Sequence, residues 1–185
     1  MLYLAFMLLA QAEAISSVPA SVAVLQEEEA QSLERAAVAK EAEASKRIEG
    51  QSTEQLSSAL TAALSDRSKL IYQAGHGVYV EYTAPDGQLR MWYPNNLRVV
   101  KGSWGVRKVK GRLRACFHYS NAVNPVTQVF EPTECVSAVQ TLSEADVLKS
   151  WAGDAFGLMR DRIPYRKGKM DMPSPETLPK AAPSN

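Results

Sequence analysis

Short runs of alternating apolar and polar residues, separated by turn-forming residues, fill the chain between Gly77 and Val139. Successive side chains of a strand point to opposite faces, so this alternation predicts strands with one apolar face. The separators suit tight turns, because Pro85 presets φ, Gly87 tolerates a positive φ, and Lys110-Gly111 forms a further turn. The segment is predicted to form an antiparallel meander or partial barrel of about five strands.

The predicted fourth strand shows this alternation most clearly. One face carries Leu113, Ala115, Phe117 and Tyr119, and the other carries Arg112, Arg114, Cys116 and His118. A loop from Ser120 to Thr133 then leads to a fifth strand around Cys135 to Val139.

Two helices are predicted to flank these strands. Ser52 and Gln55 form a capping box for the first helix, whose leucines recur at positions 56, 60 and 64 and would cover the apolar sheet face. Ser143 is the expected cap of a second helix, with an apolar stripe from Ala145 to Met159. The predicted fold class is therefore mainly β with flanking helices, an α+β arrangement.

The N-terminal residues 1–14 resemble a secretory signal peptide. An apolar stretch from Leu2 to Ala10 precedes small-residue cleavage patterns ending at Ala12 and Ala14, although no Lys or Arg precedes the stretch. A buried N-terminal helix is the alternative. Export would place the protein in the periplasm or the medium, with no transmembrane segment after processing.

The rest of the chain divides by composition into three parts. Residues 15–51 are rich in Ala and Glu and predict a helical stalk or linker, with a partner-binding coiled coil as the alternative. Residues 52–163 form the β-rich domain. Residues 164–185 are basic and then Pro-rich, and are predicted to be a disordered tail.

Several motifs resemble a group of small secreted alphaproteobacterial domains of unknown function. These are the leading TEQLSSAL helix, the Y-x-x-P-D-G hairpin, the G-x-W strand and the C-F strand, within about residues 53–140. The resemblance implies an exported bacterial β-rich module and carries no established activity to particular residues.

The two cysteines, Cys116 and Cys135, are predicted to form a disulfide, since an even pair in an exported protein is most simply oxidised. Two alternatives use the same residues: a zinc site with His76 and His118, and a nucleophile and base pair of Cys116 with His118. A small periplasmic hydrolase using His118 or His76 is the enzymatic form of this hypothesis. No cofactor or metal is predicted, because no phosphate-binding loop, dinucleotide fingerprint or metalloprotease motif occurs.

One charge pattern stands out although the net charge is only +1. No Asp or Glu occurs from Gln88 to Arg114, while basic and aromatic residues alternate along the predicted strands. The residues predicted to bind a ligand are Arg90, Trp92, Lys101, Trp104, Arg107, Lys108, Arg112 and Arg114.

This basic face predicts a non-enzymatic binding or envelope-structural module that contacts an anionic envelope component or an acidic protein. Nucleic acid is disfavoured by the predicted export. Three alternatives stay open: cations that only protect strand edges, an internal cover made by the acidic Glu27 to Glu54 region, and a secreted enzyme inhibitor presenting the loop 121–132.

Overall fold

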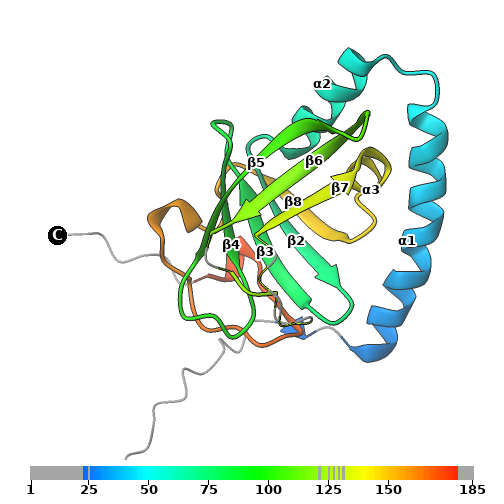
Figure 1. The fold of residues 1–185 in the computed structure, drawn as a ribbon. Coiled ribbons are helices and arrows are strands. Elements are labelled where there is room, and N and C mark those ends of the chain that lie inside the picture. Colours follow the sequence, from blue (N-terminus) through cyan, green and yellow to red (C-terminus); the bar gives the residue numbers. More distant parts are fainter. Residues whose placement is uncertain are drawn as a thin grey trace, which may run out of the picture.

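A computed structural model describes residues 23, 24, 26–120, 122–124, 126, 128, 130 and 132–178, so the predicted signal peptide lies outside it. The main feature is a seven-stranded antiparallel sheet that curls into a half-barrel (Figure 1). Its strands in chain order are β2 (Arg67–Gln73), β3 (Gly77–Thr83), β4 (Gln88–Trp92), β5 (Val100–Val109), β6 (Arg112–Tyr119), β7 (Thr133–Ser137) and β8 (Val147–Ala152). They lie in the order β7-β6-β5-β4-β3-β2-β8.

The concave face of the sheet forms one of two cores. The Tyr119 hydroxyl on β6 donates to Glu81 Oε2 on β3 over 3.2 Å, although β4 and β5 lie between these strands in the sheet. Side chains from non-adjacent strands meet in this way only on the inside of a curled sheet. This core contains Leu64, Ile71, Tyr79, Leu89, Met91, Ala115 and Phe117.

The predicted count of about five strands is too low, because β2 and β8 were not anticipated. Strand β2 is preceded by a helix and carries Ser68 and Lys69 in buried positions, so its sequence shows no clean alternation. Both polar side chains are satisfied: Ser68 Oγ donates to Gly153 O over 2.7 Å, and Lys69 pairs with Glu144 at 2.8 Å.

The predicted helix from Ser143 to Met159 is wrong. Ser137, with Gln140, caps a shorter helix, α3 (Ala138–Ser143), and Glu144 ends it in the left-handed conformation. Leu148, Trp151 and Ala152 of the predicted stripe belong to β8, which pairs with β2. Backbone pairing with β2, extended at its end by the 2.9 Å hydrogen bond from Gly153 N to Asp66 O, outweighs the local helical pattern.

The predicted first helix is confirmed as α2 (Thr53–Leu64), with the full capping box of Ser52 and Gln55. Leu60 and Leu64 are buried, and Leu64 belongs to the concave core, so α2 closes one end of the half-barrel. The Ala/Glu-rich segment forms α1 (Glu27–Ile48), which packs along α3 and does not stand free as a stalk (Figure 1).

The convex face of β2, β3 and β4 is covered by the end of the described chain. This segment contains the 3-10 turns η1 (Leu158–Arg160) and η2 (Pro175–Thr177) and the strand β9 (Asp171–Met172), which pairs with β1 (Ala23–Val24). Lys167 is 1% exposed, and Tyr165 O accepts a 3.0 Å hydrogen bond from Trp92 Nε1. Disorder was therefore wrongly predicted for residues 164–178, because apolar residues spaced along a Pro-rich sequence pack as a strap without regular structure.

No helix among the described residues is both long and apolar enough to cross a membrane.

Candidate functional site

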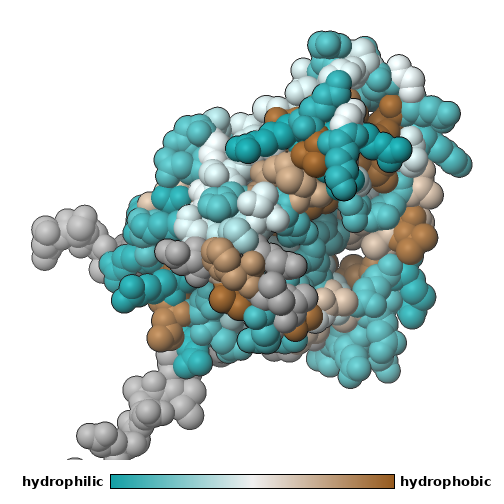
Figure 2. Space-filling model, in the orientation of Figure 1, coloured by the Kyte–Doolittle hydropathy of each residue, from teal (hydrophilic) through white to brown (hydrophobic). Residues whose placement is uncertain are grey.

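The β5–β6 hairpin carries a cluster of cations at the end of the molecule near α2. We call Arg107, Lys108, Lys110, Arg112 and Arg114 the hairpin cations. Hydrophilic side chains gather over this hairpin in the space-filling view (Figure 2). Its turn has Lys110 at φ 49° and Gly111 at φ 80°, as a tight two-residue turn requires.

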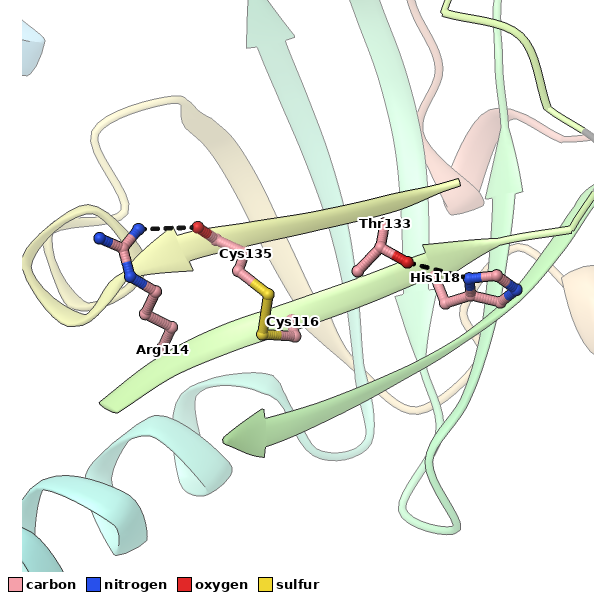
Figure 3. Close-up of a disulfide and its surroundings, with 5 residues drawn as sticks. All are labelled: Arg114, Cys116, His118, Thr133 and Cys135. Carbon is pink, nitrogen blue, oxygen red and sulfur yellow. Dashed lines mark hydrogen bonds between the residues drawn. A yellow bond between two sulfur atoms is a disulfide. The ribbon is translucent and has the colours of Figure 1, made fainter. Parts of the chain in front are cut away.

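The pairing register places three of these cations on the convex face. Arg107 lies directly opposite Arg114, and Arg112 lies one pleat further along β6 on the same face. Cys116, His118 and Thr133 continue this face (Figure 3). The predicted division of β6 into a basic and an apolar face is thus confirmed.

Cys116 and Cys135 form the predicted disulfide, which joins directly paired positions of β6 and β7 (Figure 3). Arg114 Nη1 donates to Cys135 O over 3.0 Å, so the arginine is anchored beside the disulfide. Both thiols are used, which removes them as zinc ligands or nucleophiles in this oxidised state. Among the described residues, no group of three or more His, Cys, Asp or Glu side chains could hold a metal ion.

Of the residues predicted to bind a ligand, Arg90 and Trp92 are buried, whereas Lys101 is exposed. Trp92 is fully buried, and the Arg90 guanidinium donates to Asp161, to Leu89 O and to Gln88 Oε1. Asp161 also pairs with Lys101. Hydrogen bonds from Lys101 and Arg90 lower the pKa of the Asp161 carboxyl, so the two cations share one carboxylate within the chain.

Trp104 is half-buried on the other face of β5, where its Nε1 donates to Ala84 O over 2.8 Å. Its indole therefore supports the β3–β4 turn, and its ring packs against the concave core. The aromatic part of the predicted face does not assemble around the cations.

The hairpin cations differ from Arg90 and Lys101 because none of them takes part in an ion pair within the described chain. Among the described carboxyl groups, Glu54 on α2 is the one whose pKa this cluster shifts. Its pKa is lowered first by hydrogen bonds to its own backbone and to Ser52, and least by Lys108. The predicted acidic cover is not formed by α1, because Lys40 and Arg47 of this helix hydrogen bond to Glu144 O and Leu142 O.

A small pocket of about 260 Å³ opens beside the disulfide on the convex face. Ser103, Arg107, His118 and Thr133 line it together with Cys116. One guanidinium with two hydroxyls and an imidazole is a donor set suited to a phosphate or sulfate group. The pocket is therefore a second element of the cationic surface.

Neither histidine has the surroundings of a general base. His118 Nδ1 lies 3.2 Å from Thr133 Oγ1, and His76 Nδ1 lies 2.8 Å from the Tyr93 hydroxyl. Burial, and then the nearby Lys169 ammonium, lower the pKa of His76. Within the described residues no carboxylate hydrogen bonds to either imidazole, so neither histidine has a carboxylate that would orient it as the base of a hydrolase.

The open end of the half-barrel holds a larger hollow that the sequence did not indicate. Its volume is about 1610 Å³, and it lies between the β2–β3 turn, the β4–β5 connection and the start of the chain after β6. The inner wall contains Tyr79, Met91, Tyr93, Val100 and Tyr119. The described residues of the loop 121–132 contribute Ala122, Val123 and Asn124, and none of these side chains indicates an inhibitor's target.

Glu81 is a buried carboxyl on the same concave face of the sheet as this wall. It is 6% exposed, lies opposite Met91 on β4, and accepts the Tyr119 hydrogen bond. Burial raises the pKa of Glu81 to about 7, against the opposing effects of the Tyr119 hydrogen bond and Lys69. Strand alternation alone would place Glu81 in solvent. The sequence signal against this is that Tyr79 and Tyr82 lie on opposite faces of the same strand, which indicates that both faces of β3 are buried.

No protein family, curated protein or solved structure matches this chain.

Proposed function

We propose that this chain is an exported, non-enzymatic binding module whose hairpin cations contact an anionic component of the cell envelope. The single observation that carries the proposal is the cross-strand pair of Arg107 and Arg114, which no described carboxylate neutralises. Like charges directly opposite on neighbouring strands destabilise a sheet. A bound anion would relieve this repulsion, so the surface gains stability when it is occupied.

The shape of the surface supports a polymer or a lipid surface over a single small anion. The cations extend from the hairpin turn at Lys110 along both strands to the pocket beside the disulfide. Phosphate or sulfate groups repeated along a glycan or across a bilayer would contact several of these side chains together. The disulfide and the signal-like N-terminus support export.

The binding test uses vesicles of phosphatidylcholine alone and of an equimolar mixture with phosphatidylglycerol. The wild-type protein should bind only the anionic vesicles, and salt should weaken the binding. Replacing Arg107, Arg112 and Arg114 with Glu should reduce the affinity at least roughly 100-fold, since each cation near an anionic surface contributes about 1 kcal/mol.

A matched control changes the same amount of charge elsewhere. Arg35, Lys46 and Lys149 are exposed on α1 and β8, and replacing all three with Glu should leave most of the binding intact. Equal losses in the two triple variants would show that net charge alone drives binding and would overturn the proposal. Wild-type binding to an acidic protein such as poly-glutamate, without binding to anionic vesicles, would overturn the envelope assignment.

Export is tested separately by the intact mass of the protein recovered from its native cells. The expected mass corresponds to cleavage after Ala12 or Ala14, with a gain of two hydrogens on reduction of the single disulfide. An uncleaved chain with free thiols would contradict export.

A further inference from the structure

The hollow at the open end of the half-barrel is separate from the hairpin cations. The opposite end of the barrel is closed by helix α2, and the β5–β6 turn lies at that closed end (Figure 1). The hollow is instead bordered by residues 73–76, 93–101 and the described residues from 119 to 124. Anything bound there would not touch the hairpin cations.

The inner wall presents mainly aromatic rings to a ligand, because the hydroxyl groups of its tyrosines already have hydrogen-bond partners within the chain. The Tyr79 hydroxyl donates to Gln73 Oε1 over 3.2 Å, and the Tyr119 hydroxyl donates to Glu81. The Tyr93 hydroxyl lies 2.8 Å from His76 Nδ1. The ring centroids of Tyr79 and Tyr93 are 5.8 Å apart. The wall therefore offers ring faces, with the Met91 and Val100 side chains, to an apolar or aromatic body.

Charge is distributed unevenly between the inside and the rim. Glu81 lies on the inner side, and within the described chain the hydrogen bond from Tyr119 is the one its carboxyl accepts. Arg98 and Lys169 line the outer part, are exposed, and form no ion pair with any described residue. An anionic group would therefore be attracted to the rim.

The rim also carries exposed apolar surface. Leu97 is 73% exposed and lies next to Arg98 in the connection between β4 and β5. An apolar side chain beside an unpaired guanidinium matches a molecule whose charged and apolar parts are adjacent.

We propose that the open end of the half-barrel binds a small amphiphile, with its anionic head at Arg98 and Lys169 and its aromatic or apolar body against Tyr79, Tyr93 and Tyr119. The carboxylate, sulfonate or phosphate head stays at the rim, and the body displaces water from the ring faces. This site does not depend on the proposed contact of the hairpin with the envelope.

The test compares three probes with the same ring system: 2-naphthoate, 2-naphthylmethanol and 2-naphthylmethylammonium. Titration calorimetry on the full chain should give the tightest binding for naphthoate, about tenfold tighter than for the neutral alcohol, and the weakest for the ammonium. Replacing Arg98 and Lys169 with Glu should reverse the order of the anion and the cation.

Two further variants separate the site from general effects. Val100→Trp adds a large ring at a half-buried position of the wall and should weaken binding of all three probes, with an unchanged thermal transition confirming the fold. Replacing Arg35 and Lys149 with Glu changes the net charge equally and should leave the order of affinities unchanged. Equal affinity for the three probes, or no effect of Val100→Trp, would overturn the proposal.

The two proposals fail independently. The triple Glu variant of Arg107, Arg112 and Arg114 should bind naphthoate like the wild type. The double Glu variant of Arg98 and Lys169 should still bind anionic vesicles. Loss of naphthoate binding in the hairpin variant would contradict the separation of the two sites.

Discussion

Ionisation of the Glu81 carboxyl lowers the stability of the fold. Its carboxyl sits in the concave core with one hydrogen bond, from Tyr119, and the Lys69 ammonium nearby is paired with Glu144. Because burial disfavours the carboxylate, the folded protein holds this proton up to a pH of about 7, whereas the ordinary Glu value is 4.5. The folded state thus binds more protons than the unfolded state between these two pH values.

This difference in proton binding predicts that Glu81→Gln increases the free energy of unfolding in a pH-dependent way. Wild type and variant should be equally stable at a pH below the ordinary Glu pKa of 4.5, and the variant should become more stable as the pH rises towards about 7. The folded and ordinary pKa values differ by 2.5 units (7 minus 4.5), which limits the variant's gain in unfolding free energy to roughly 3 kcal/mol at a pH above 7. Urea unfolding at several pH values measures it, with Glu43→Gln on the exposed side of α1 as the control. Parallel pH profiles for wild type and Glu81→Gln would contradict the buried assignment.

The pairing of strands β6 and β7 is reinforced by the disulfide between Cys116 and Cys135. Cys116 and Cys135 are 19 positions apart in the sequence, and β7 is an edge strand of the sheet. Replacing both cysteines with Ala should cost about 3 kcal/mol, because the unfolded chain regains the freedom of this loop. Urea unfolding should show the same loss for reduced wild type and no response of the variant to reductant. A loss below about 1 kcal/mol would mean that β7 is held by its hydrogen bonds alone.

Patterns within a few neighbouring residues predict the central strands and α2. The remaining elements depend on pairing with strands that are distant in the sequence. The alternation on β6 and the capping box at Ser52 act within a few residues, so the sequence reveals them. In contrast, Leu148 and Trp151 match a helical stripe as well as a strand, and only pairing with β2 selects the strand. The same limit applies to the site, since nothing near Arg90 in sequence reveals that Asp161 will neutralise it.

The whole molecule is held together by a strap that the sequence presents as a tail. Residues 164–178 cross the convex face of the sheet, where Val78 N donates to Lys169 O over 2.7 Å and the Lys167 ammonium donates to Val78 O. Burial lowers the pKa of Lys167 to about 8. The strap thus covers the convex core and also brings Lys169 to the rim of the hollow.

Gly77→Ala tests whether the strap stabilises the entire fold. Gly77 has φ 80°, and a Cβ placed there would collide with Lys169 O of the strap. Gly111 has the same φ of 80° with nothing within 4 Å of a Cβ, so Gly111→Ala carries the backbone strain without the collision. Gly111→Ala should cost about 1 kcal/mol of unfolding free energy, and Gly77→Ala about 1–3 kcal/mol more, because the strap must shift and expose the convex core. Urea unfolding followed by tryptophan fluorescence measures both, since Trp92 lies beneath the strap. Equal losses for the two variants would mean that the strap contributes nothing to the stability of the half-barrel.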